Sequence, residues 1–155
     1  MIIDIPNYER LNIENIVFDM NGTIAENGII SEDIRKKIIN LTKTYNVFVL
    51  TSDTYGTINQ YFTSTNVIVN ILKSTNATKE KREFVEHLGK NATIAIGNGS
   101  NDSEMIKVSK LGISIIGHEG LSTKTIVNSD IIFNSFEDVY NSLLNTKRIV
   151  ATLRE

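Results

Sequence analysis

The sequence predicts an α/β fold, a three-layer sandwich with a mainly parallel, Rossmann-like sheet, in one domain covering residues 1–155. Short runs of β-branched residues alternate with amphipathic stretches of helical length, which is typical of right-handed βαβ units. The runs 16–18, 47–50 and 93–96 are almost continuously apolar, as expected for strands that helices cover on both faces. A hydrophobic content of 41% in 155 residues supplies one core of ordinary size.

The first half of the chain opens with a short N-terminal segment and then follows this alternation. IENIVFD predicts a strand at 13–19 that runs into an acid. Asn27-Gly28, between apolar residues, indicates a hairpin turn. Ser31 is a suitable N-cap for a helix over 32–44. The next expected elements are a strand at 46–52, a helix over 56–64 and a strand at 67–72.

The second half continues in the same order. KEKREFVEHLG predicts a helix over 79–89, and TIAIGN predicts a strand at 93–98. The C-terminal TKRIVATLRE mixes basic and apolar residues, so it either packs against its own domain or docks on a partner subunit. The remaining expected elements are a helix over 103–111, a strand at 113–117, a helix over 121–128, a strand at 130–134 and a helix over 136–145.

Composition excludes several classes of function. The net charge of −2 leaves no positive surplus to attract a phosphate backbone, so we expect no nucleic-acid partner. The chain has no cysteine, which excludes disulfides and thiolate metal sites. No signal peptide pattern and no membrane-spanning apolar run are found, so we expect a cytoplasmic protein with no membrane partner.

Polar residues gather where three of the predicted strands end. The first strand ends in Asp19, the second in Thr51-Ser52-Asp53, and the fourth runs into GNGSND at 97–102. Parallel sheets bind ligands at the carboxyl ends of their strands, so these three ends are expected to form one crevice. The glycines and small polar groups of GNGSND offer donors to an anion and oxygens to a metal.

Each piece also has an interpretation without function. Asn21-Gly22 alone is a common hairpin turn. Asp102 could simply cap the helix that follows it, and an aspartate at a strand end is often a turn former. Lys81, with Glu80 and Glu83 nearby, would usually be a solvated helix charge. The functional interpretation rests on the occurrence of all these pieces in chain order.

Taken together, these pieces resemble the four motifs of the haloacid dehalogenase (HAD) superfamily of phosphatases and phosphotransferases. Its D-x-D-G-T motif is similar to Asp19-Met20-Asn21-Gly22-Thr23, and its second motif to a strand ending in Thr51. Its helix lysine resembles Lys81, and its G-D-G-x-N-D is similar to 97–102, with Asn98 in place of the first acid. The T-S-D at 51–53 resembles the T-G-D of P-type ATPases, so the chain looks like a capless soluble relative of their phosphorylation domain.

The resemblance implies a role for each matching residue. Asp19 would be the nucleophile that forms an aspartyl phosphate. Mg²⁺ would be held by Asp19, the backbone carbonyl of Asn21 and Asn98, with Asp102 compensating for the charge that Asn98 lacks. The catalytic set is then Asp19, Asn21, Thr51 and Lys81. Phosphate would be bound by Gly22, Thr23, Thr51, Ser52, Lys81 and Asn101.

Asn21 is the departure with the largest chemical consequence. In phosphatases of the superfamily an aspartate at this position protonates the leaving oxygen and then activates water, and an amide does neither. P-type pumps, which the chain resembles at TSD, also lack an acid there. We therefore expect an enzyme, a slow phosphatase that prefers good leaving groups such as aryl or acyl phosphates. The alternative is a weakly catalytic phosphate-binding or regulatory module; a receiver-like domain is disfavoured because IIDIP lacks paired acids.

The segments that carry a cap domain in larger relatives are short in this chain. Residues 22–31 hold only a turn and a hairpin, and 54–76 hold one helix and one strand, so no cap is expected. The site would then accept a small phosphate ester or acyl phosphate, or a macromolecular phosphate, or it would be closed by a neighbouring subunit in a homo-oligomer. Tyr55 and Tyr61 either line the mouth of the site or pack in the core.

Overall fold

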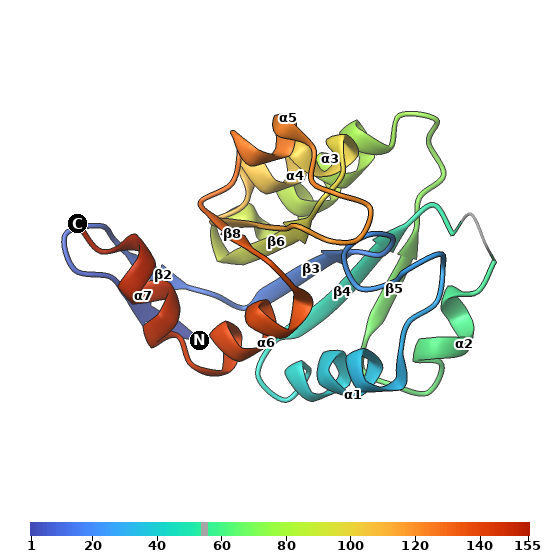
Figure 1. Cartoon of the computed structure of the whole chain (residues 1–155), viewed down its shortest axis with the longest axis horizontal. Helices are drawn as coiled ribbons and strands as arrows, with labels where there is room; N and C mark the ends of the chain where they lie inside the picture. Colours follow the sequence, from blue (N-terminus) through green and yellow to red (C-terminus); the bar gives the residue numbers. More distant parts are fainter. Residues whose placement is uncertain (54–55) are drawn as a thin grey trace.

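The computed structural model describes residues 1–53 and 56–155. Its main sheet has the six-stranded order β5-β4-β3-β6-β7-β8, and every neighbouring pair is parallel. Helices cover both faces of this sheet, with α3, α4 and α5 on one side and α1, α2 and α6 on the other (Figure 1). The predicted three-layer α/β sandwich is therefore confirmed.

The elements of the main domain follow the predicted alternation. The strands are β3 (Asn15–Asp19), β4 (Asn46–Thr51), β5 (Ile68–Ile71), β6 (Thr93–Gly97), β7 (Leu111–Ile115) and β8 (Ile131–Phe133). The helices are α1 (Glu32–Leu41), α2 (Ile58–Phe62), α3 (Ala77–Gly89), α4 (Ser103–Val108), α5 (Thr123–Ile126) and α6 (Phe136–Leu144). Two short 3-10 turns, η1 (Lys90–Ala92) and η2 (Ser100–Asp102), flank β6.

Local rules explain several of these boundaries. The Ser31 hydroxyl accepts a hydrogen bond from the backbone N–H of Ile34, as predicted for the cap of α1. Asn27 and Gly28 have positive φ angles of 51° and 76°, and Glu26 and Ile29 exchange backbone hydrogen bonds across them. The predicted hairpin turn is therefore confirmed.

The prediction was wrong by several residues around β7. The helix expected to reach residue 111 ends at Val108, and the strand expected at 113–117 begins at Leu111. The backbone N–H of Lys110 bonds to the carbonyl of Thr93 in β6, so pairing with the sheet begins two residues before the apolar run suggests.

The chain ends form a small second layer that the sequence did not predict. β1 (Ile2–Asp4) and β2 (Arg10–Asn12) make an antiparallel pair, and α7 (Lys147–Leu153) lies beside them (Figure 1). Ile149 of α7 is fully buried in the same apolar cluster as Ile3 and Leu11. The C-terminal segment therefore packs against its own domain.

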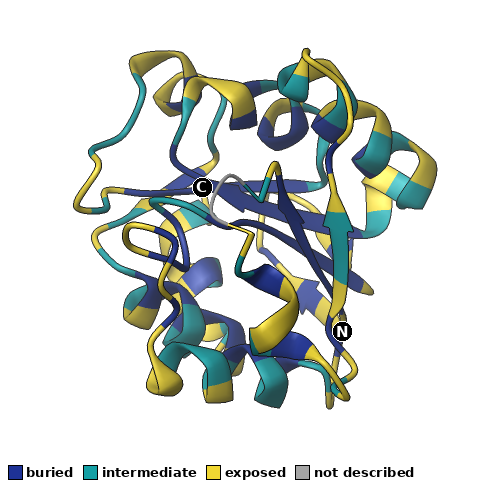
Figure 2. Cartoon of the chain, turned by 90° about the vertical axis from the view of Figure 1, so that its right-hand side faces the viewer, coloured by how far each residue is buried: buried dark blue, intermediate teal, exposed yellow. Residues whose placement is uncertain are grey.

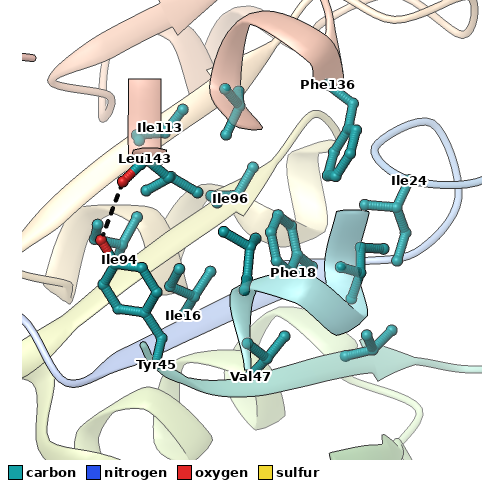
Figure 3. Close-up of a cluster of buried hydrophobic side chains, with 14 of the residues drawn as sticks. Ile16, Phe18, Ile24, Tyr45, Val47, Ile94, Ile96, Ile113, Phe136 and Leu143 are labelled. Atoms are coloured by element: carbon teal, nitrogen blue, oxygen red, sulfur yellow. Dashed lines mark hydrogen bonds between the residues drawn. The ribbon is translucent and has the colours of Figure 1, made fainter. Parts of the chain in front are cut away.

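The core is split by the sheet into two apolar clusters. Ile16 and Phe18 of β3 face the larger cluster with α1, α2 and α6, whereas Val17 between them faces the smaller one with α3 and α4. This alternation is the two-residue period of a strand buried on both faces. Figure 2 shows the dark, buried strands between partly exposed helices, and Figure 3 shows Phe18 packed near Phe136 in the larger cluster.

The topology places the ends of β3 and β6 side by side. From β3 the chain moves outward through β4 to β5 and then returns to add β6 on the other side of β3. Ligands of such sheets bind at the carboxyl ends of the strands where this reversal occurs. No cap domain is present in the described residues, because 22–31 hold the turn and hairpin, and the described part of 54–76 holds α2 and β5. No helix within 1–53 or 56–155 is long and apolar enough to cross a membrane.

Candidate functional site

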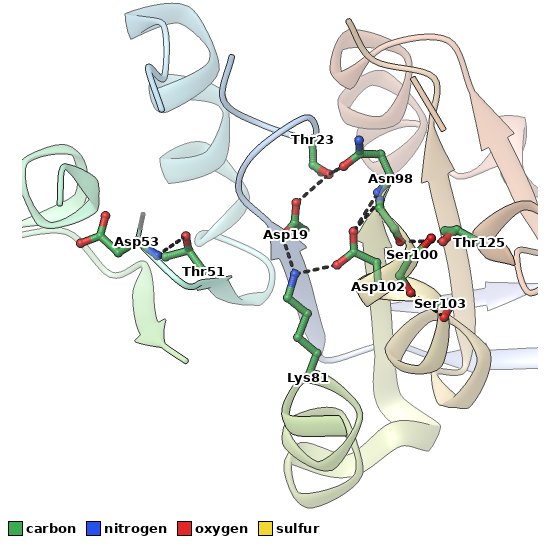
Figure 4. A network of polar contacts seen from close by, with 11 residues as sticks. Asp19, Thr23, Thr51, Asp53, Lys81, Asn98, Ser100, Asp102, Ser103 and Thr125 are labelled. Carbon is green, nitrogen blue, oxygen red and sulfur yellow. Dashed lines mark hydrogen bonds and ion pairs between the residues drawn. The ribbon is translucent and has the colours of Figure 1, made fainter. Parts of the chain in front are cut away.

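Asp19 lies at the centre of a polar network at the carboxyl end of β3. Asp19 is only 7% exposed, and its two carboxylate oxygens have different hydrogen-bond partners. Lys81 Nζ donates to Oδ1, and Thr23 Oγ1 donates to Oδ2 over 3.3 Å (Figure 4). Asp19 is therefore held in one orientation by a cation on one side and a hydroxyl on the other.

Lys81 reaches this network from α3 and is buried. It is 1% exposed, and its ammonium bonds Asp19 and also Asp102 Oδ1, the latter over 2.7 Å. Lys81 and Val85 lie four residues apart on the helix face that turns toward the sheet. The interpretation of Lys81 as a solvated helix charge is therefore wrong.

Asp102 is fully buried and has both oxygens occupied. Oδ1 accepts from Lys81, while Oδ2 accepts from the backbone N–H groups of Asn98 and Gly99 at 3.0 and 2.9 Å. Asp102 occupies the N-cap position of α4, but its side chain makes no cap bond to that helix. It holds the preceding turn and the lysine instead.

The charges in this network shift the pKa values of Asp19 and Lys81. Burial and the negative charge of Asp102 together raise the pKa of Asp19 to about 7, although the Lys81 ammonium lowers it. Burial alone would lower the pKa of Lys81, but the two adjacent carboxylates outweigh that effect and raise it. The lysine is therefore a permanent cation at the site.

Asn98 connects three loops at this edge. Its Oδ1 accepts from Thr23 Oγ1 over 3.2 Å, and its Nδ2 donates to the carbonyl of Gly120 over 3.1 Å. Its backbone carbonyl accepts from the N–H of Ser122. Gly22, with a φ of 76°, packs so closely that a Cβ there would lie 2.4 Å from Asn98 Nδ2. Both ends of the amide are thus used in joining the loops after β3, β6 and β7.

Asn21 presents the opposite situation. It is half-buried, and its Oδ1 is inaccessible to solvent and has no hydrogen-bond partner among the described residues. No hydrogen bond within the described part of the chain uses its backbone carbonyl either. A buried polar oxygen without a partner costs free energy, so Asn21 is less well satisfied than Asn98 in the described chain.

The oxygens around Asp19 are of the type that Mg²⁺ prefers. They comprise the Asp19 carboxylate, the carbonyl of Asn21 and the amide oxygen of Asn98, which has a second lone pair beyond the one that Thr23 uses. Mg²⁺ is commonly held by one or two carboxylates together with water and substrate phosphate. The donor set fits the ion with a single carboxylate. No cluster of three or more His, Asp or Glu side chains that could hold a metal is found in 1–53 and 56–155.

The other predicted phosphate-binding residues lie around this centre with different environments. Thr51 is buried one residue beyond Leu50, which pairs with Asp19, and its Oγ1 accepts from the backbone N–H of Asp53 over 2.9 Å. Ser52 and Asn101 are exposed. Asp53, with a φ of 46°, caps α2 by accepting from Thr57 and Ile58, so it serves the fold.

The structure describes one of the two tyrosines that were expected either at the mouth of the site or in the core. Tyr61 packs against the larger core cluster, and its carbonyl accepts from Arg35 Nε over 2.6 Å. Tyr55 lies outside the described residues.

A groove adjoins the network on the side of α1 and α6. It has a volume of about 840 Å³ and begins at Gly22 and Thr23. Its other walls are the hairpin at 26–29, the loop at 116–119 and the turn at 134–137. The sequence analysis did not identify the 116–119 loop, although GHEG directly after an apolar strand resembles the polar strand ends that it did identify.

Sequence comparison relates this chain to proteins of two kinds, while no family model matches it. It is 48% identical over 62 residues to an uncharacterised protein of Methanocaldococcus jannaschii, covering 40% of this chain and 67% of that protein. It is 39% identical over 62 residues to human phospholipid-transporting ATPase ID. That match covers 40% of this chain but only 5% of the ATPase.

Several solved structures with a similar fold are phosphatases. The 3-deoxy-D-manno-octulosonate 8-phosphate phosphatase of Moraxella catarrhalis, in complex with magnesium and phosphate ions, superposes with a TM-score of 0.64 at 15% identity over 92% of this chain and 94% of that one. The cobalt-bound deoxy-D-mannose-octulosonate 8-phosphate phosphatase of Haemophilus influenzae superposes with a TM-score of 0.67 at 12% identity, covering 93% of this chain and 94% of that one. A phospho-aspartyl intermediate analogue of phosphoserine phosphatase superposes with a TM-score of 0.59 at 13% identity, covering 84% of this chain and 98% of that one.

Proposed function

We propose that this chain, which has the fold of solved haloacid dehalogenase superfamily phosphatases and no cap in its described residues, is a Mg²⁺-dependent phosphohydrolase or phosphotransferase that acts through Asp19. The observation that carries the proposal is the buried Asp19 carboxylate, fixed between the Lys81 ammonium and the Thr23 hydroxyl. Such a carboxylate is oriented for attack on phosphorus, and the cation beside it stabilises the negative charge of the transferring group.

The first step is transfer of the phosphoryl group to Asp19. An oxygen of Asp19 forms a bond to phosphorus while the bond to the leaving oxygen breaks, and the leaving oxygen keeps the electron pair. The Lys81 ammonium and the Thr51 hydroxyl would donate hydrogen bonds to the phosphoryl oxygens. Asp102 keeps Lys81 in position. When bound by Asp19, the Asn21 carbonyl and Asn98, Mg²⁺ neutralises phosphate charge.

The second step is transfer from Asp19 to water or another acceptor. A water oxygen bonds to phosphorus, the aspartyl bond breaks, and the carboxylate is regenerated with release of phosphate. Asn21 has no titratable proton, so it neither protonates the leaving group nor takes a proton from water. General acid/base catalysis contributes typically 10²–10⁴ in rate, roughly 3–5 kcal/mol of barrier, so we expect slow turnover of good leaving groups.

A second candidate function is a phosphate-binding module with little turnover. It is favoured by the bonding of Asn98, whose amide is already used by Thr23 and Gly120, and by the full burial of Asp102, which leave Asp19 as the main anionic ligand. The two candidates differ in whether Asp19 becomes phosphorylated.

The deciding experiment measures hydrolysis of 4-nitrophenyl phosphate and of acetyl phosphate with and without Mg²⁺. We expect slow, Mg²⁺-dependent turnover that Asp19→Asn abolishes and that Asp4→Asn, an exposed control at the N-terminal hairpin, leaves unchanged. Beryllofluoride should give a fluorine NMR signal that Asp19→Asn removes. Turnover that persists in Asp19→Asn would refute the nucleophile, whereas no turnover and no beryllofluoride signal would favour the binding module.

A further inference from the structure

The groove beside Asp19 is fixed in position relative to the phosphate site. One wall begins at Thr23, whose hydroxyl donates to Asp19. The opposite wall is held by Asn98 Nδ2, which donates to Gly120, and by Gly117, where a Cβ would lie 2.4 Å from the carbonyl oxygen of Gly22. The leaving group of a phosphate ester whose phosphoryl group lies at Asp19 would therefore extend into this groove.

Two of the residues that line the groove are large, exposed apolar side chains. Ile29, from the hairpin, is 66% exposed, and Ile116, from the loop after β7, is 50% exposed. A pair of exposed isoleucines in a concave site costs hydration free energy until a ligand covers them. The groove therefore fits a ligand with an apolar body.

The charged side chains of the groove are almost all negative. Its described lining contains no Lys or Arg, and its carboxylates are Glu26, Asp33, Glu119 and Glu137. Lys37 bonds Asp33 and Glu137, so one ammonium is shared between two of these acids. Among the described residues, the ion pair given for Glu26 is with His118 Nε2, at 3.9 Å from Glu26 Oε2. The groove therefore carries a net negative charge at neutral pH.

We propose that this groove binds the leaving group of the substrate, and that the leaving group is an amphipathic cation, an apolar body carrying an amine or a quaternary ammonium. The inference rests on the proposed function, because it places the phosphoryl group at Asp19. An anionic leaving group would be repelled by Glu26 and Glu119, whereas a cation would be attracted. The ester that fits both sites is thus the phosphate of an amino alcohol or amino phenol.

Three aryl phosphates test this selectivity because they differ in charge at the far end and little in leaving-group strength. They are the phosphates of tyramine, 4-ethylphenol and 4-hydroxyphenylpropionate. Binding of each to the full-length Asp19→Asn protein is measured by calorimetry, which needs no turnover, and kcat/KM is measured with the wild-type protein and Mg²⁺. We expect both the affinity and kcat/KM for tyramine phosphate to exceed those for the propionate by about tenfold, since the groove carboxylates attract one end charge and repel the other through partial solvent screening.

Two double variants locate the origin of the preference. Glu26→Gln with Glu119→Gln removes two groove charges and should reduce the tenfold preference to about threefold or less. Asp4→Asn with Glu14→Gln makes the same charge change at exposed residues away from the groove and should leave it unchanged. Added salt at about 0.5 M should weaken the preference, because the groove carboxylates are open to solvent.

The outcomes separate this inference from the proposed function. A binding preference for tyramine phosphate without turnover of any compound supports the groove and refutes the enzyme. Asp19-dependent turnover with equal affinity for all three compounds, or with a preference for the propionate, supports the enzyme and overturns the groove. Absence of binding by all three, or loss of the preference in the control double variant alone, also overturns it.

Discussion

Asn21 in the loop after β3 and Asn98 in the loop after β6 both lie at the candidate site, and their two amides are bonded in opposite ways. Asn98 uses Oδ1 and Nδ2 to join Thr23 to Gly120, whereas Asn21 Oδ1 is buried with no partner in the described chain. The Asn98 amide therefore joins neighbouring loops, whereas the Asn21 side-chain oxygen makes no such contact in the described chain. The two replacements of an acid by an amide therefore have different consequences.

The largest expected effect is a gain of activity in Asn21→Asp. A carboxylic acid there supplies the missing proton transfer, so hydrolysis of 4-nitrophenyl phosphate should rise by about 10²–10⁴-fold. Stability should fall by about 1–3 kcal/mol, because the buried Asn21 side-chain oxygen has no partner among the described residues and a carboxylate there adds a negative charge two residues from Asp19. Steady-state kinetics measure the effect, with Asn21→Ala as the control that gives no gain. If Asn21→Asp hydrolysed 4-nitrophenyl phosphate no faster than wild type, a missing acid at position 21 would not be what limits the rate.

Asn98→Asp should produce the opposite result, a loss of stability without a gain of activity. A carboxylate cannot donate to the carbonyl of Gly120, and it adds a further negative charge beside Asp19 and Asp102, which share one lysine. We expect a loss of about 2–4 kcal/mol in the free energy of unfolding at pH 8. Urea unfolding measures it with and without Mg²⁺. If millimolar Mg²⁺ restored full stability and raised activity, position 98 would be a metal-ligand position like that of the superfamily motif.

Thr23→Val should weaken both loops moderately. Valine has nearly the same shape but lacks the hydroxyl that reaches Asp19 Oδ2 and Asn98 Oδ1. We expect a loss of about 1–2 kcal/mol in the free energy of unfolding and a roughly tenfold lower kcat/KM. Thr23→Ser, which keeps the hydroxyl, is the matched control. A valine variant as stable and active as the serine variant would show that the two loops are not coupled through this contact.

The smallest expected effect lies away from both loops, at Tyr45. Burial raises the pKa of Tyr45 to about 12, so its neutral form is favoured by folding. This contribution is present below the unfolded pKa of about 10 and is lost as the pH rises toward 12. We expect a loss of about 1 kcal/mol in the free energy of unfolding. Thermal unfolding between pH 9 and 12 should show the loss in wild type, much less of it in Tyr45→Phe, and the wild-type loss unchanged in Asn21→Asp.

Local patterns were sufficient to predict the frame of the molecule but not its ends. The buried strands and the helices between them follow from apolar runs and from signals such as Ser31 and Asn27-Gly28, which act over a few residues. β1, β2 and α7 were missed because each is short and is stabilised mainly by long-range packing, as between Ile149 and Leu11. The boundary at Leu111 shifted because a tertiary hydrogen bond to β6 determines it.

The sequence predicted which residues would lie together at the site, but it did not predict the hydrogen bonds between them. Motif order brings Asp19, Lys81 and Asp102 together, and the structure has all three in contact. Sequence could not reveal that Asn98 donates to Gly120, since that contact joins loops 22 residues apart through a side-chain geometry with no local signal. The groove was missed for the same reason, because its walls come from three separate segments.

The enclosure of Lys81 has a practical consequence for spectroscopy. An ammonium that is 1% exposed and bonded to two carboxylates exchanges its protons with water far more slowly than a surface lysine. Its nitrogen should therefore give a resolved NMR resonance among the averaged signals of the surface lysines. Since one of the two carboxylates is the group that we propose to be phosphorylated, this single resonance would report in real time whether Asp19 is free, modified or bound to an analogue.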